Sequence, residues 1–191
     1  MLFKNPKLWW KFEGRYYHKD LYRGIKNLLK WIPVIWKDRN WDHTFIYDIL
    51  EHKLKLQSEY IGKYGNHVTA KRDAEIMMVC VKLIQRLKDG YYDGENHDYH
   101  KTKYWFEDIE DKPGYSTMES ELLEENFDDY FKKYPLIHKR VLNGEGVFNI
   151  QVDDEGGRKE RVAMNISRIN HDRARKLLFK IMEENIEKWW D

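Results

Sequence analysis

The sequence predicts a mainly α-helical fold, a single-domain bundle of five or six helices with one small β-hairpin. Two observations support this prediction. Apolar residues recur with the 3.6-residue period of an amphipathic helix in several long segments, whereas residues 147–166 show the alternation of apolar and polar residues that is typical of paired strands. A chain of 191 residues is long enough for one well-buried domain. We therefore expect residues 1–191 to form a single domain.

The centre of the predicted bundle is an antiparallel helix pair, residues 42–61 and 67–89. The turn between them contains Gly62 and Gly65, and helices joined by a short turn run antiparallel. In each segment the apolar residues fall on one face. Burial of one large apolar side chain contributes about 1.5–3 kcal/mol. Four side chains of the pair are expected to be buried: Leu50, Met77, Val81 and Ile84.

Towards the N-terminus, the sequence predicts an aromatic arm over residues 1–18, followed by a helix from Leu21 to about Ile32. Asp20 is a suitable N-cap for this helix, because its side chain can accept a hydrogen bond from the first backbone N–H groups. Pro33 should end or kink the helix, because proline has no N–H to donate.

Residues 90–115 are predicted to form an irregular acidic loop, in which residues 99–106 are either a short strand or an ordered loop. A Ser-x-x-Glu capping box then predicts a helix over residues 116–131. A shorter helix is expected over residues 135–142, where proline occupies the first helical position.

Near the C-terminus, apolar residues alternate with polar ones on both sides of Gly156-Gly157. Glycines at such a position indicate a turn, so residues 147–166 are predicted to form the β-hairpin, with a helix as the alternative for this segment. Asn170 is expected to be the N-cap of a final amphipathic helix.

Charge is unevenly distributed, although the formal net charge is only +1. Residues 1–40 contain ten Lys or Arg and three acids, whereas residues 91–130 contain thirteen acids and three lysines. Such runs form solvated faces or pair with each other in the fold. The balanced total gives no argument for nucleic-acid binding by bulk electrostatics.

Cysteine usage and hydropathy indicate the compartment. The chain has one cysteine, Cys80, so no intramolecular disulfide can form, and a buried thiol in a reducing compartment is expected. No apolar run is long enough for a signal peptide or a membrane span. We expect a protein of the cytoplasm without a membrane partner.

The motifs of common enzymes are missing from the sequence. It has no phosphate-binding glycine loop, no G-x-S-x-G elbow and no Cys-x-x-Cys pair. Asp48 and His52 lie one helical turn apart and could hold a metal ion together with Asp73 or Glu75 of the adjacent helix, whereas the pair His171-Asp172 has no suitable further ligand. We expect no catalysis, no metal and no cofactor. Metal-assisted hydrolysis of a phosphate ester is the enzymatic alternative.

A cluster of aromatic residues and arginine suggests a ligand site. Trp36, Arg39, Trp41 and Tyr47 combine rings that can stack on a nucleobase with a guanidinium that can bind a phosphate. The alternative interpretation is that the tryptophans fill a corner of the core, with Arg39 paired to a neighbouring aspartate.

A basic surface is expected near the C-terminus, over residues 158–180. Its candidate phosphate contacts are Arg168, Arg173, Arg175 and Lys176. Nucleic-acid binding is therefore an alternative function, although an ordinary helix with a basic polar face would show the same pattern.

Residues 35–42, with the sequence Ile-Trp-Lys-Asp-Arg-Asn-Trp-Asp, together with residues 49–54 and 70–76, resemble a group of uncharacterised small proteins of tailed bacteriophages. The resemblance covers mainly residues 20–90. It implies an accessory protein that works in the cytoplasm of an infected bacterium. Such a protein would act by binding: it would block a host defence protein or sequester a nucleotide-type immune signal, and a homo-oligomer is possible.

Overall fold

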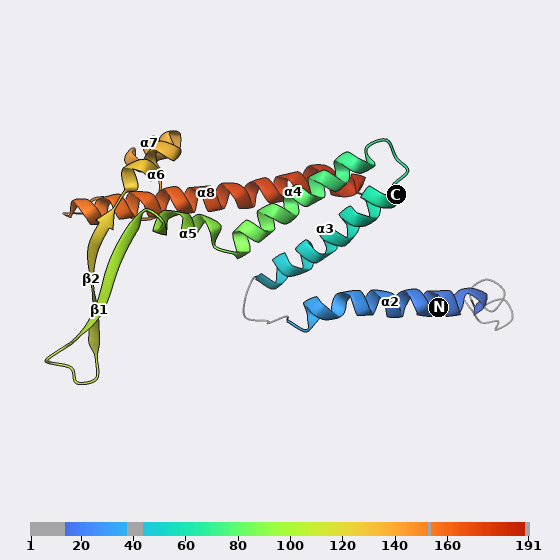
Figure 1. Cartoon of the computed structure of the whole chain (residues 1–191), viewed down its shortest axis with the longest axis horizontal. Helices are drawn as coiled ribbons and strands as arrows, with labels where there is room; N and C mark the ends of the chain where they lie inside the picture. The colour runs from blue at the N-terminus through green and yellow to red at the C-terminus, as the bar shows by residue number, and fades with distance from the viewer. Residues whose placement is uncertain (1–13, 38–43, 153, 190–191) are drawn as a thin grey trace. The chain divides into compact units, whose positions relative to one another are not determined.

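The computed structural model describes residues 14–37, 44–152 and 154–189 (Figure 1). These residues are mainly helical and contain one two-stranded antiparallel sheet, which confirms the predicted fold class. The described residues contain seven α-helices rather than five or six. The chain divides into two compact units, residues 1–52 and 53–191. That the whole chain acts as a single domain stays a prediction.

Unit 1 contains the 3-10 helix η1 (Gly14–Tyr16), the helix α2 (Tyr17–Ile35) and the first part of α3 (Thr44–Tyr64). Residues 1–13 of the predicted aromatic arm lie outside the described residues. Helix α2 begins at Tyr17, so Asp20 lies in its first turn and is not the predicted N-cap, and the helix continues past Pro33 to Ile35. The helix tolerates Pro33 because only one N–H is lost, and Trp36 N still donates to the carbonyl of Ile32 at 2.9 Å.

The predicted antiparallel pair is present as α3 and α4 (Ala70–Lys88). In unit 2, the hydroxyl of Ser58 donates to the carbonyl of Ala74 at 2.9 Å. The turn requires Gly65, because a Cβ atom there would lie 2.5 Å from the carbonyl oxygen of Ile61 and 2.8 Å from the Cβ of Ala70.

Three of the four side chains predicted to be buried in this pair are buried: Met77, Val81 and Ile84. Leu50 is only half-buried. The 3.6-residue period of α4 therefore identified its buried face correctly.

Unit 2 is assembled around α8 (Glu155–Asn185), a helix of 31 residues. At 1.5 Å per residue it is about 46 Å long. It contacts α4, α5 (Tyr91–His97), α6 (Phe127–Lys133) and α7 (Pro135–Leu142). The main apolar cluster joins α6 and α7 to α8: Phe127, Tyr130, Phe131, Ile137, Val141, Val162, Ala163 and Ile166. Helix α8, rather than the α3–α4 pair, is the centre of unit 2.

The prediction of a β-hairpin at residues 147–166 is wrong. Residues 143–152 form a loop, and residues 155–166 belong to α8. The positions of Val162 and Ile166 fit the alternating pattern of a strand. They are also four residues apart, which places both on the same, buried face of a helix. The glycines follow an N-cap: the carboxylate of Asp154 accepts from the N–H groups of Gly156 and Gly157 at 3.3 and 2.6 Å. The final helix therefore starts at Glu155 and not at Asn170.

The hairpin lies instead at β1 (His100–Asp108) and β2 (Ser116–Glu125). The predictions of an irregular loop over residues 90–115 and of a helix over residues 116–131 are therefore wrong in part. The N-terminal part of that loop is α5, and only the end of the predicted helix is helical, as α6. Ser116 does not cap a helix, because its hydroxyl donates to Asp108 across the sheet at 2.8 Å. Strand pairing is non-local and supplies backbone partners that a local capping motif does not reveal.

Candidate functional site

The most prominent candidate surface is the β-arm, which we define as residues 100–125. Its base is fixed to the helical core of unit 2. The ring of His100 stacks on the buried ring of Phe127, with centroids 5.1 Å apart. At the end of β2, Lys159 Nζ lies 2.6 Å from a carboxylate oxygen of Glu125. This hydrogen bond is the main reason why the pKa of Glu125 is below its usual value.

One face of the β-arm is apolar and exposed. Phe106 and Met118 are direct cross-strand partners and are 73% and 60% exposed. Tyr104, two residues from Phe106 and therefore on the same face, is 54% exposed. Aromatic and thioether side chains are common in protein–protein interfaces, and contiguous exposed apolar groups often indicate such an interface.

The opposite face of the β-arm is charged. Lys101 Nζ pairs with Glu124 at 2.7 Å, and Trp105 Nε1 donates to Glu107 at 2.8 Å. Exposed carboxylates dominate the outer part of the arm: Glu107, Asp108, Glu110, Asp111, Glu119 and Glu121. The β-arm therefore presents an apolar strip surrounded by negative charge.

A buried carboxylate ties α5 to α6 beside this base. Glu95 is 7% exposed; it accepts a hydrogen bond from the hydroxyl of Tyr134 at 2.8 Å and pairs with Lys133. Burial, together with this bond to Glu95, raises the pKa of Tyr134 to about 12. The phenol stays protonated at neutral pH, so it serves as a hydrogen-bond donor that positions α6.

The predicted ligand site at Trp36, Arg39, Trp41 and Tyr47 is described only in part. Arg39 and Trp41 lie outside the described residues. Trp36 is 82% exposed, whereas Tyr47 is buried. The ring of Tyr47 is therefore not available for stacking on a ligand, and the described residues add no support to this site.

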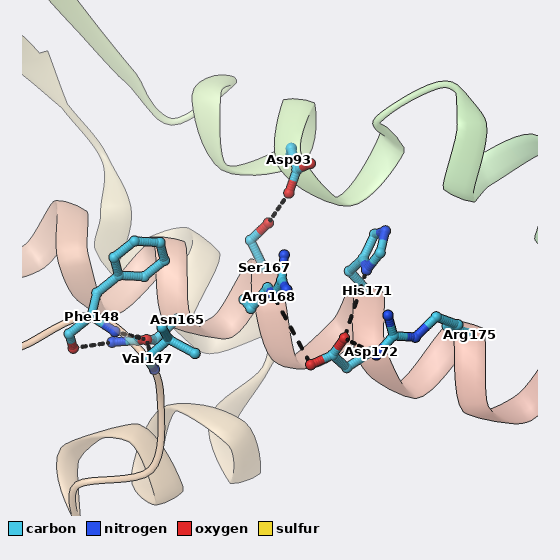
Figure 2. A network of polar contacts seen from close by, with 9 residues as sticks. All are labelled: Asp93, Val147, Phe148, Asn165, Ser167, Arg168, His171, Asp172 and Arg175. Atoms are coloured by element: carbon cyan, nitrogen blue, oxygen red, sulfur yellow. Dashed lines mark hydrogen bonds and ion pairs between the residues drawn. The ribbon is translucent and has the colours of Figure 1, made fainter. Parts of the chain in front are cut away.

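The predicted basic surface lies on α8, and Figure 2 shows its middle section. Asp172 forms ion pairs with two of the four candidate phosphate-binding side chains: Arg175 Nη2 lies 3.0 Å and Arg168 Nε 4.0 Å from its carboxylate. Arg173 and Lys176 are exposed. With 100° between successive residues, the four side chains spread over nearly half of the helix circumference rather than one stripe. The surface is basic but partly neutralised.

Figure 2 also shows the side-chain amide of Asn165, a residue that no pattern in the sequence singles out. Asn165, 1% exposed, accepts hydrogen bonds from the backbone N–H groups of Val147 and Phe148 at 2.9 and 3.0 Å. Its amide nitrogen donates to the carbonyl of Phe148 at 2.8 Å. This clamp shapes the loop 143–152, which lines a hollow of about 660 Å³ with Arg158 at its wall.

The weak metal candidates do not assemble into a site. His52 packs edge-on against Trp31, with ring centroids 5.0 Å apart. His171 Nδ1 faces its own neighbour Asp172 at 3.9 Å. In the described part of the chain, no group of three or more His, Cys, Asp or Glu side chains could hold a metal ion.

Strand β1 confirms the strand alternative for residues 99–106, whereas its pairing with residues 116–125 was not predicted, although two signals were present. Tyr104 and Phe106 follow the period of a strand, and Pro113-Gly114 is a turn signal between the two strands.

Among the described helices none is long and apolar enough to cross a bilayer. No protein-family model, no curated protein and no solved structure matches this chain.

Proposed function

We propose that this chain is a non-catalytic accessory binding protein that engages a host factor in the cytoplasm of a bacteriophage-infected bacterium. The phage context comes from the sequence resemblance of residues 20–90. The observation that carries the binding role is the β-arm, whose paired Phe106 and Met118 are more than half exposed on a ribbon with a fixed base. A preorganised ribbon loses little conformational entropy when it binds.

The chemistry of the β-arm indicates the kind of partner. An apolar strip with a carboxylate rim fits a protein surface that has an apolar groove bordered by Lys or Arg side chains. The rim carboxylates would speed association, and the ring of Phe106, once covered by the partner, would supply most of the affinity. In the function that we favour, the β-arm binds a host protein, for example a defence protein, and blocks its action.

A pull-down followed by calorimetry tests this proposal. The full chain is used to capture proteins from a bacterial lysate, and the captured partner is purified and titrated. The variant Phe106→Ser/Met118→Ser should bind at least tenfold more weakly, because removal of an interface anchor costs about 2 kcal/mol or more.

The matched control is Leu136→Ser/Leu142→Ser, which removes two exposed leucines of α7. Its affinity should equal that of the parent. Equal weakening by both variants would contradict a role of the β-arm. A rise in melting temperature with a nucleotide, unchanged in the arm variant, would instead favour the capture of a nucleotide-type signal. At 100 times its dissociation constant such a ligand adds about 2.7 kcal/mol.

Nucleic-acid binding by α8 is the second candidate, because the cationic side chains of Arg173 and Lys176 are exposed. Binding of this kind weakens steeply with salt, with a slope of about 0.9 per phosphate contact in log–log form. The variant Arg173→Glu/Lys176→Glu should lower this slope. A salt-independent affinity, or an unchanged slope in the variant, argues against this function.

The phosphohydrolase alternative receives the least support. It needs Asp48 and His52 to share an ion with a third ligand. The ring of His52 is instead engaged with Trp31, and the described residues assemble no triad of donors.

A further inference from the structure

Helix α2 is strongly amphipathic, yet none of its 19 residues is buried. Most of its apolar residues, with the exception of Val34, follow one face: Leu21, Ile25, Leu28, Ile32 and Ile35. Leu28 is 64% exposed and the neighbouring Leu29 is 63% exposed. At 100° per residue, the apolar side chains cover about half of the helix circumference.

The opposite face of α2 is cationic. At 100° per residue, Lys19, Arg23, Lys26 and Lys30 fall within a single strip. The single acidic residue of α2 is Asp20, whose carboxylate lies 3.8 Å from the guanidinium of Arg23. The helix therefore combines a wide apolar face with clear positive charge.

Aromatic residues mark the borders between these two faces. In the helical projection, Tyr22 lies at one edge of the apolar face and Trp31 lies at the other. Tyrosine and tryptophan prefer the boundary between hydrocarbon and water, because each has an apolar ring and one polar atom.

We propose that α2 lies in the surface of an anionic lipid bilayer, with Leu21, Ile25 and Leu28 among the acyl chains and its lysines at the phosphate headgroups. A wide apolar face, a cationic polar face and border aromatics are the features of such interfacial helices. The expectation of no membrane partner was based on the lack of a spanning segment, and an interfacial helix does not span. This binding is independent of the β-arm.

Vesicle flotation of the full chain tests this proposal. The protein should float with vesicles of equimolar phosphatidylglycerol and phosphatidylcholine, float much less with phosphatidylcholine alone, and dissociate as salt is added. The variant Lys26→Glu/Lys30→Glu should bind at least roughly 25-fold more weakly, since each cation near an anionic surface contributes about fivefold. Leu28→Asp should also bind at least about tenfold more weakly, because it places a charge in the apolar face.

Two control variants match these changes in unit 2. Lys71→Glu/Lys82→Glu makes the same change in net charge on exposed positions of α4, and Leu136→Asp places an aspartate at an exposed leucine of α7. Both should float like the parent, and circular dichroism should show an unchanged helix content for all four variants.

Three results would overturn the proposal. One is the absence of flotation with anionic vesicles. Another is equal loss of flotation in the test and control variants. The third is a concentration-dependent oligomer, seen by light scattering and abolished by Leu28→Asp, in a protein that does not float; a second copy of the chain would then cover α2.

Discussion

At the scale of single residues, Asn165 is the side chain with the clearest structural task. Its amide pairs with three backbone groups of residues 147 and 148. Gly146 allows this close approach, because a Cβ atom there would lie 2.3 Å from the amide oxygen of Asn165. The change Asn165→Ala should therefore lower the free energy of unfolding by about 1–3 kcal/mol.

Urea unfolding measures this effect. The control is Asn149→Ala, because the side chain of Asn149 accepts one exposed hydrogen bond, from Gln151 N. Loss of this bond should lower the free energy of unfolding by less than about 0.5 kcal/mol. A similar small loss in both variants would mean that the amide clamp does not hold the loop in solution.

Cys80 is a second residue with a measurable consequence. Its thiol is fully buried in α4, and burial raises its pKa from 9.0 to about 11. At pH 8 the thiol should not react with a thiol reagent such as DTNB in the native protein, and it should react completely in guanidinium chloride. Rapid labelling of the native protein would show that this face of α4 is open.

The raised pKa of Cys80 also determines how the stability of the fold changes with pH. Above pH 9 the unfolded chain loses this proton while the folded chain keeps it. The stability associated with the protonated thiol is therefore present below pH 9 and is lost as the pH rises towards 11. Cys80→Ala should reduce this loss.

At the scale of secondary-structure elements, the start of α8 depends on Asp154. Its carboxylate is the N-cap acceptor for Gly156 and Gly157. The variant Asp154→Ala should lower the free energy of unfolding by about 1 kcal/mol, whereas Asp154→Ser should retain most of it. Chemical denaturation of the two variants checks this. Equal stabilities would indicate that the first turn of α8 is frayed.

The elements also show what the sequence could and could not predict. Helix α4 was predictable, because its apolar residues repeat over five turns and Gly90 follows its end. The start of α8 was not, because the spacing of Val162 and Ile166 fits both a strand and a helix over so short a distance. Only packing against Phe127 and Val141 in the core decides between these two interpretations.

The same distinction, between features set by local sequence and features set by packing, applies to the candidate sites. Exposed arginines on α8 were predictable from helical period alone. The face of the β-arm was not, because it depends on the register that sets Phe106 opposite Met118, and register is a property of two segments together. The role of Asn165 was likewise hidden, since its partners are backbone groups on a separate loop.

At the scale of the whole molecule, stability should be unevenly distributed. The core of unit 2 lies where α6 and α7 meet α8, whereas α2 and the outer β-arm bury little. Hydrogen exchange followed by mass spectrometry should show the slowest amides in α4 and in residues 162–182, and the fastest described strand amides near the tip of the arm. Equal protection of the arm and of α8 would contradict this distribution.

The two strands of the arm form a sheet of their own, so each has one unpaired edge along its length. Unpaired edges can pair with the edges of another molecule and so nucleate fibrils, and charged side chains are the usual defence against this. Here most of the repulsion comes from carboxylates, among them Glu119 and Glu121. If these carboxylates were replaced by neutral side chains, as in Glu119→Gln/Glu121→Gln, amyloid-like assembly would therefore begin at the arm rather than at the helices.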